Sequence, residues 1–306
     1  MRMKRLIAAT TFVSVAAIYA SEPVHATEGV TPLLGGVTIG VPAGAAPPPG
    51  LYSSTTLFYL QGDLKNGSGQ KTPLKLNEIE VSETLLLSTS LEMFGGQLYG
   101  YIVQPYKGVT KEIGGTKDWQ SGAFNTIVSP VNLSWNLGGG YFFSAGAAFY
   151  LPNGTYSPTG TKAANGYFTF EPTAAITYLK DGYHFTANAV LDINSENSDT
   201  NYKSGNDFGI DFTATKAFGN WSLGAGGYVV QQFENDKVNG QVVPASSFNG
   251  RGNKWSEIGI GPYASYNFGD FQVSAWATFD VLAKNTISSN IGWVRLSVPL
   301  GNPLKE

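Results

Sequence analysis

Segments that alternate apolar and polar residues recur along most of the chain, and this period of two constrains the fold more than any other feature. In residues 271–281, every odd position is apolar, while the even positions hold Gln, Ser, Trp, Thr and Asp. Residues 183–194 repeat the pattern, with Tyr, Phe, Ala, Leu and Ile at the odd positions. Because successive side chains of a strand point to opposite faces, each segment has one apolar and one polar face. A helix would scatter these residues around its axis, so the pattern predicts strands.

Twelve such segments can be recognised, and most reach the ~9–11 residues with which a tilted strand crosses a bilayer. They cover approximately residues 50–60, 77–92, 97–106, 126–137, 141–151, 166–179, 183–194, 207–217, 221–233, 255–266, 271–282 and 289–300.

The connections between these segments alternate in length. Tight turns are expected where glycine, asparagine or aspartate cluster, at residues 94–96, 138–140, 180–182, 219–220 and 267–270. Longer polar loops are expected at residues 61–76, 107–125, 152–165, 195–206 and 234–254. Tight turns at one rim and long loops at the other are typical of outer-membrane barrels, whose turns face the periplasm. An even strand count places both ends of the barrel on the periplasmic side.

Composition fits strands that face lipid on one side. Charged residues make up only 13% of the chain, about half the usual share for a soluble domain. No uninterrupted apolar run of ~18 residues follows the N-terminal region, so helical membrane spans are not expected. The chain has no cysteine, which leaves neither a disulfide framework nor a thiolate metal site. Its net charge of −3, without a basic stripe, argues against nucleic-acid binding.

A secreted β-sandwich or a soluble barrel would also show alternating strands and turns. The outer face of such a fold would be charged, whereas here the apolar faces carry aromatic residues such as Phe168, Phe185 and Phe279. Aromatic residues on that scale are unusual in contact with water and suit lipid contact and aromatic girdles. The sequence therefore predicts an all-β fold: a transmembrane antiparallel β-barrel over residues 50–306, in the outer membrane of a Gram-negative cell.

The N-terminal region falls into two parts. Residues 1–26 combine a basic start, a short apolar stretch and small residues before position 27, which is the order of a secretory signal peptide. Residues 27–49 contain Gly35-Gly36 and Pro47-Pro48-Pro49 and cannot pair as a central strand. This Gly/Pro-rich segment is either a periplasmic tail or a plug inside the barrel, and the tail is the simpler expectation.

A series of short motifs resembles a known family. Pro48-Pro49-Gly50-Leu51-Tyr52 opens the first segment, Pro152-Asn153-Gly154-Thr155-Tyr156 follows the fifth, and Gly261-Pro262-Tyr263 and Arg295-Leu296 lie near the end. From about Pro48 to Leu300, their order and spacing resemble the outer-membrane proteins grouped as "MetA-pathway of phenol degradation". The resemblance implies a barrel linked to uptake of phenol-like aromatic or other hydrophobic compounds.

One feature departs from the usual pattern of outer-membrane barrels. Many such chains end on an aromatic residue of the last strand, whereas here Gly301-Asn302-Pro303-Leu304-Lys305-Glu306 follows Leu300. This ending bears on how the barrel-assembly machinery, an expected partner, recognises the chain.

If the apolar faces meet lipid, the opposite faces line the lumen. The candidate substrate path then comprises Glu171, His184, Asn188, Asp192, Asp211, Tyr228, Glu257, Tyr263, Trp276, Asp280 and Arg295. A polar interior with aromatic faces admits water and can hold a flat, weakly polar ligand. Barrels of ~8 strands are filled by side chains and those of 16–18 strands are open, so twelve strands predict a narrow or partly obstructed path. Alternatively, these groups form a hydrogen-bonded network that stiffens the wall.

The sequence thus predicts a channel or transporter for small hydrophobic or aromatic compounds, without cofactor or metal. The expected partners are outer-membrane lipid and those small molecules. A non-transporting structural or interaction barrel is the first alternative, and a lipolytic enzyme using His184 is the second. The enzyme is disfavoured because His184 lies beside the predicted 180–182 turn, far from the outer leaflet.

Overall fold

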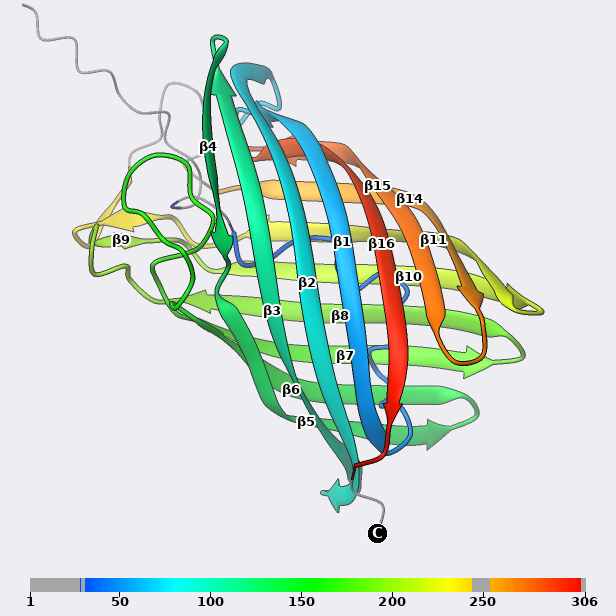
Figure 1. The fold of residues 1–306 in the computed structure, drawn as a ribbon. Coiled ribbons are helices and arrows are strands. Elements are labelled where there is room, and N and C mark those ends of the chain that lie inside the picture. Colours follow the sequence, from blue (N-terminus) through cyan, green and yellow to red (C-terminus); the bar gives the residue numbers. More distant parts are fainter. Residues whose placement is uncertain (1–27, 29–30, 244–253, 304–306) are drawn as a thin grey trace, which may run out of the picture.

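The computed structural model describes residue 28, residues 31–243 and residues 254–303. The predicted signal peptide lies outside the described residues, as does most of the second half of the predicted 234–254 loop. Most of the strands form one antiparallel sheet that closes on itself (Figure 1). The predicted transmembrane barrel of twelve antiparallel strands is confirmed.

The wall of the barrel consists of β1 (Gly50–Lys65), β2 (Lys71–Met93), β3 (Gly96–Ile113), β5 (Thr126–Gly138), β6 (Tyr141–Leu151), β7 (Thr169–Lys180), β8 (Tyr183–Asn194), β10 (Asp207–Phe218), β11 (Trp221–Gln232), β14 (Ser256–Asn267), β15 (Gln272–Lys284) and β16 (Ile287–Gly301). A further strand, β4 (Thr116–Ala123), pairs with the outer part of β3. The short strands β9 (Tyr202–Lys203), β12 (Lys237–Val238) and β13 (Gln241–Val242) form a small sheet among the loops.

The predictions of long loops at residues 61–76 and 107–125 are wrong. Within residues 61–76, β1 and β2 continue to a tight turn at 66–70, and within residues 107–125, β3 continues to Ile113 and folds back as β4. These stretches are polar because they rise beyond the hydrocarbon layer, where both faces of a strand can meet water. Their strand character was therefore hidden by the loss of alternation.

Tight turns define one rim of the barrel. Between β7 and β8, Asp181 and Gly182 both have positive φ angles, of 53° and 76°, which is the backbone of a type I′ hairpin turn. Leu51 of β1 pairs with Gly301 of β16, so the barrel begins and ends at this same rim. In the orientation expected of outer-membrane barrels this turn rim is periplasmic, and the opposite rim, called here the outer rim, faces the exterior.

The burial pattern confirms which face of each strand meets lipid. The outward apolar side chains are exposed, for example Phe185 at 46%, Phe212 at 43% and Phe279 at 48%. Their inward neighbours Thr186, Thr213 and Thr278 are all buried. Within the described residues, there is no helix of the length and hydropathy needed to cross a membrane.

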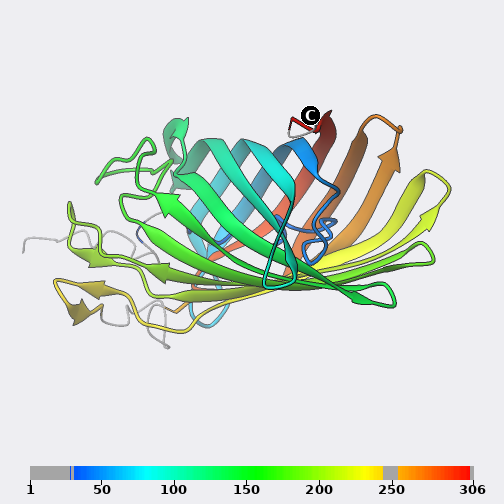
Figure 2. The same ribbon diagram turned by 90° about the horizontal axis from the view of Figure 1, so that it is seen from below.

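The described part of the Gly/Pro-rich segment runs inside the barrel and is not a tail outside it (Figure 2). At the outer rim, the backbone N–H of Glu28 donates to Ser204 Oγ at 3.3 Å. Deep in the lumen, the N–H of Gly44 donates to Thr177 Oγ1 at 2.9 Å. At the turn rim, Ser88 Oγ donates to the carbonyl of Pro47 at 2.8 Å. Residue 28 and residues 31–49, together termed here the luminal segment, therefore lie along the lumen from the outer rim to the start of β1.

Candidate functional site

An acid on β10 and a base on β16 hold the middle of the luminal segment. Asp211 on β10 accepts hydrogen bonds from the N–H groups of Gly36 and Thr38, at 2.8 and 2.9 Å, and from Thr38 Oγ1 at 2.7 Å. From β16, the Arg295 guanidinium donates to the carbonyls of Val37 and Ile39. These contacts satisfy backbone groups that a segment without regular secondary structure would otherwise bury unpaired.

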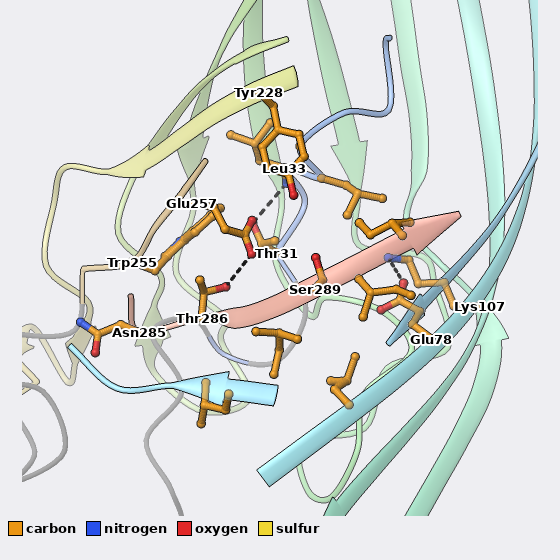
Figure 3. Close-up of a pocket in the computed structure, with 17 residues that line it drawn as sticks. Thr31, Leu33, Glu78, Lys107, Tyr228, Trp255, Glu257, Asn285, Thr286 and Ser289 are labelled. Carbon is orange, nitrogen blue, oxygen red and sulfur yellow. Dashed lines mark hydrogen bonds and ion pairs between the residues drawn. The ribbon is translucent and has the colours of Figure 1, made fainter. Parts of the chain in front are cut away.

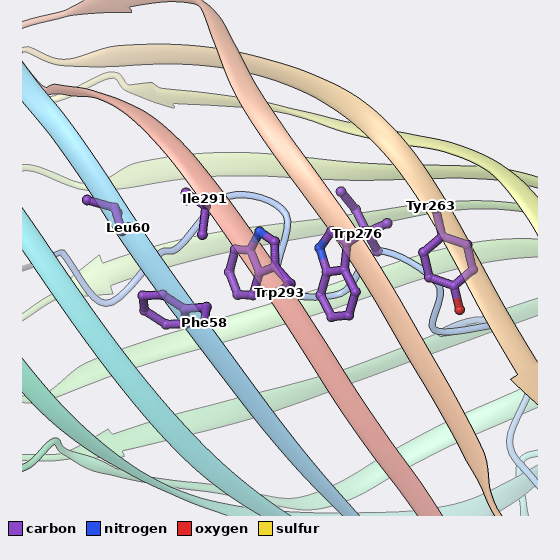
Figure 4. Close-up of a cluster of buried hydrophobic side chains, with 7 residues drawn as sticks. Phe58, Leu60, Tyr263, Trp276, Ile291 and Trp293 are labelled. Atoms are coloured by element: carbon purple, nitrogen blue, oxygen red, sulfur yellow. The ribbon is translucent and has the colours of Figure 1, made fainter.

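An aromatic cluster covers the wall beside this segment (Figure 4). Trp276 and Trp293 stack on adjacent strands, with ring centroids 5.3 Å apart and an interplanar angle of 7°. Phe58 packs on Trp293 at 4.8 Å, and Ile39 of the luminal segment is fully buried against the cluster. The Arg295 guanidinium lies 4.7 Å from the Trp276 ring, close enough for a cation–π contact. The cluster thus joins the luminal segment to the lumen wall.

A cavity of about 110 Å³ lies between the start of the luminal segment and the wall (Figure 3). Leucine and isoleucine form its apolar walls, from Leu33, Leu34, Leu60, Leu64, Leu76, Ile287 and Ile291, and Tyr228 and Trp255 add aromatic surface. Polar and charged side chains also converge on it, among them Glu78, Lys107, Glu257 and Ser289. A hollow that combines apolar walls with convergent polar groups is typical of a small-molecule site.

The charged groups at this cavity are paired with one another. Lys107 Nζ lies 2.9 Å from Glu78 Oε1 and 3.1 Å from Glu80 Oε2, and all three side chains are less than 10% exposed. On the other side, Glu257 Oε1 accepts a hydrogen bond from Thr286 Oγ1 at 3.3 Å. The polar part of the lining therefore offers carboxylate acceptors, while its one lysine is already engaged by two carboxylates.

Three buried oxygen-bearing side chains, called here the acidic row, cross the wall beside Trp255 of the cavity lining. Asp192 on β8, Asp207 on β10 and Gln232 on β11 are directly paired in register and fully buried. The carboxylate oxygens of Asp192 and Asp207 have no hydrogen-bond partner among the described residues. No group of three or more histidine, aspartate or glutamate residues in the described part of the chain is arranged to hold a metal ion.

At the outer rim, the first described residue is held by side chains of two loops. Glu28 Oε1 accepts a hydrogen bond from Tyr156 at 3.1 Å, and Oε2 accepts one from Asn197 at 2.7 Å. Lys162 Nζ lies 4.0 Å from Glu28 Oε1. Burial raises the pKa of Tyr156 to about 12 and lowers the pKa of Lys162, so the phenol stays a hydrogen-bond donor at neutral pH. These contacts fix the outer end of the luminal segment.

The predicted path residues all lie on the inward face, but the structure divides them into groups. The luminal segment or its aromatic cluster contacts Asn188, Asp211, Tyr263, Trp276 and Arg295. Tyr228 and Glu257 line the cavity. The remaining four bond to neighbours in the wall or belong to the acidic row: Glu171, His184, Asp192 and Asp280.

Several important residues were missed by sequence reasoning. Leu33, Leu34 and Ile39 belong to a segment expected to be a tail, and Lys107 belongs to a stretch expected to be a loop. The sequence did indicate that Glu78 and Glu80 face the lumen, because they alternate with Ile79 and Val81 inside a predicted strand. The identity of their partner could not be read from that alternation.

A closed twelve-strand barrel with lipid-facing apolar side chains defines an integral outer-membrane β-barrel protein. The chain belongs to the family described as "Putative MetA-pathway of phenol degradation", whose match covers residues 62–296. The family resemblance seen in the sequence is therefore confirmed. A search of curated proteins finds no match.

A comparison with solved structures finds outer-membrane proteins. The COG4313 outer membrane channel from Pseudomonas putida F1 has a TM-score of 0.70 at 14% identity, covering 83% of this chain and 96% of that chain. The β domain of the Bordetella autotransporter BrkA has a TM-score of 0.47 at 10% identity, with coverages of 82% and 100%. The TodX deltaS2S3 mutant monoaromatic hydrocarbon channel has a TM-score of 0.42 at 10% identity, with coverages of 84% and 91%.

Proposed function

We propose that this protein is an outer-membrane channel for small hydrophobic or aromatic compounds of about the size of phenol. The observation that supports it most directly is the cavity of about 110 Å³ beside the luminal segment. For comparison, an apolar protein cavity of ~150 Å³ lined by Leu, Ile and Phe binds benzene. A single aromatic ring is therefore of the size that this cavity can hold, and the polar part of the lining can bond to a ring hydroxyl.

The surroundings of the cavity offer a continuation of the path. Leu60 and Ile291 line the cavity and also belong to the aromatic cluster around Trp276 and Trp293. A ring leaving the cavity would thus meet further apolar surface before it meets water. Transfer along such a surface avoids the cost of rehydrating apolar area at each step, about 25 cal/mol per Å².

The charge of the lining favours neutral compounds. Glu78, Glu80 and Glu257 outnumber Lys107, the cation beside them, so a phenolate or benzoate would meet net negative charge. A neutral phenol can instead donate its hydroxyl to a carboxylate oxygen. The family description and the barrel fold of the Pseudomonas putida channel agree with transport, and neither suggests an enzyme. Insertion by the barrel-assembly machinery belongs to the same proposal.

Uptake measured in a deletion strain tests the proposal. Cells that lack the protein should take up phenol and toluene more slowly, and the wild-type gene should restore the rate. Ile291→Trp places a bulky ring in the cavity and should slow uptake, because Ile291 is only 3% exposed and lines it. Val294→Trp, on the outward face of the same strand and 46% exposed, is the matched control. Unchanged uptake of every aromatic compound in the deletion strain would remove the assignment.

A non-transporting barrel is the second candidate, and the way in which the luminal segment is bonded across the lumen favours it. Side chains of two separate wall strands, Asp211 of β10 and Arg295 of β16, hold residues 36–39. Single-channel recordings in lipid bilayers distinguish the two candidates. A barrel that neither conducts nor binds aromatic compounds would support a structural role.

A further inference from the structure

A row of four charged side chains, called here the charged rung, crosses the outer surface of the barrel near the outer rim. Four side chains on adjacent strands are directly paired in register: Asp63 on β1, Lys75 on β2, Glu112 on β3 and Lys117 on β4. They share the outward face with the exposed side chains of Tyr59, Ile79, Tyr106 and Trp119, which lie at even spacings along the same strands. The rung is therefore on the outside of the wall and does not face the lumen.

The position of the rung coincides with the headgroup layer of the outer leaflet. Asp63 lies four residues beyond Tyr59, the last large aromatic residue on the outward face of β1. Four residues span roughly 13 Å along a strand, or roughly 9 Å along the membrane normal at a tilt of about 45°. The polar layer on each side of the hydrocarbon is about 5–8 Å deep. With Tyr59 at the hydrocarbon boundary, the charged rung lies at the outer edge of this layer, where the phosphates and sugars of lipid headgroups meet water.

The surface at this level is hollowed and carries available ammonium groups. A hollow of about 610 Å³ is lined by Tyr59, Asp63, Lys71, Lys75, Glu112 and Lys117, among others. Lys71 forms a close ion pair with Asp63 at 2.8 Å. Lys75 and Lys117 share the single carboxylate of Glu112 at 4.0 and 3.8 Å, which exceed hydrogen-bond length. Each ammonium has three donors, so both lysines can still bind an anion.

We propose that this hollow binds the phosphate-bearing headgroup of a glycolipid of the outer leaflet, with Lys75 and Lys117 as its principal ligands. The two side chains are 52% and 67% exposed, so a phosphate can reach them without rearrangement of the wall. The hollow is large enough for a phosphorylated sugar, and Gln61 and Asn77 one rung below supply neutral hydrogen-bonding groups for its hydroxyls. The lipid's acyl chains would then lie over Tyr59 and Ile79, in contact with the apolar wall.

Native mass spectrometry of the detergent-extracted full chain tests this site. Wild-type protein should retain phosphorylated glycolipid through purification. The double substitution Lys75→Gln with Lys117→Gln should weaken retention by roughly 25-fold, since each lysine beside an anionic headgroup layer contributes about a fivefold factor. The matched control is Lys180→Gln with Lys216→Gln, which removes two lysines from the turn rim, where Lys216 lies over Tyr183 at 3.6 Å. This control should retain as much glycolipid as the wild type.

A binding titration of the purified barrel separates lipid recognition from simple anion binding. Lipid A should bind the wild type, whereas dephosphorylated lipid A and inorganic phosphate at the same concentration should not. Lys75→Arg with Lys117→Arg should restore binding lost in the glutamine variant, and heat-dependent gel mobility verifies that each variant is folded. Equal glycolipid retention by the wild type and the glutamine variant would overturn the proposal. So would equal affinity for lipid A and its dephosphorylated form, because the rung would then be a set of ion pairs only.

Discussion

Ala174 and Thr173 are neighbours in β7 that meet opposite surroundings. Ala174 is exposed on the outward face at the middle of the strand, whereas Thr173 is half-buried and points into the lumen. Ala174→Arg should destabilise the folded barrel by roughly 2–4 kcal/mol, the cost of a cation near the bilayer midplane. Thr173→Arg should be tolerated better, because water and acidic groups lie inside. Urea titration of both variants in lipid vesicles measures the difference, and equal destabilisation would contradict the face assignment.

Asp236, in the loop after β11, should make the stability of this outer loop depend on pH. Burial raises the pKa of Asp236 to about 6, even though Tyr202 and the N–H of Gly205 donate to its carboxylate. The folded loop thus binds the proton more tightly than the unfolded chain does, and the added stability is fully present below the ordinary aspartate pKa and lost as pH rises through about 6. Hydrogen exchange of amides 234–242, corrected for intrinsic rates, should be slower at pH 4 than at pH 7.5.

Asp236→Asn serves as the control for this titration, because an amide cannot ionise in this range. Its loop amides should show the same protection at both pH values. If the substituted loop kept the full pH dependence of the wild type, another group would have to be the source.

The luminal segment has little regular structure of its own and depends on contacts with the wall. Asp211 accepts three hydrogen bonds from residues 36–38, and bonds to a charged group contribute about 1.5–3 kcal/mol each. Asp211→Asn removes the charge and one acceptor oxygen, so the segment should detach more often and the mean single-channel conductance should rise. Asp270→Asn, the same change at an exposed position of the turn rim, should leave conductance unaltered. Identical conductance in both variants would mean that Asp211 is not what retains the segment.

The sequence predicted the strands well because their alternation records a direct physical constraint, lipid on one side and water on the other. All twelve wall strands overlap a predicted segment, and β8 matches residues 183–194 at both ends. The constraint ends where the hydrocarbon ends, which is why the extensions of β1, β2 and β3 were taken for loops. The luminal segment has no periodic signal at all, because its backbone bonds to isolated side chains such as Thr177 and Thr213 instead of to a neighbouring strand.

The site was predictable only in part for a related reason. The alternation of side chains between the two faces of a strand places Tyr228, Glu257 and Trp276 in the lumen, and the structure agrees. The alternation cannot show which inward side chains contact one another, since that depends on how the luminal segment fills the lumen. Asp211 and Arg295, for example, act together on one stretch of backbone although they lie on strands that are not adjacent.

At the scale of the whole molecule, a disulfide between the luminal segment and the wall tests whether transport requires the segment to move. An ideal Cβ on Gly226 would lie 2.9 Å from Ile39 Cγ1, so cysteines at both positions would have side chains within disulfide reach. The chain has no native cysteine to compete. In the Gly226→Cys, Ile39→Cys variant, oxidation should slow phenol uptake several-fold and reduction should restore it, if rings pass by displacing the segment. Each single cysteine variant should respond to neither treatment. Uptake that continued at the full rate in the locked barrel would show instead that compounds pass beside a stationary segment, through the cavity that Leu60 and Ile291 line.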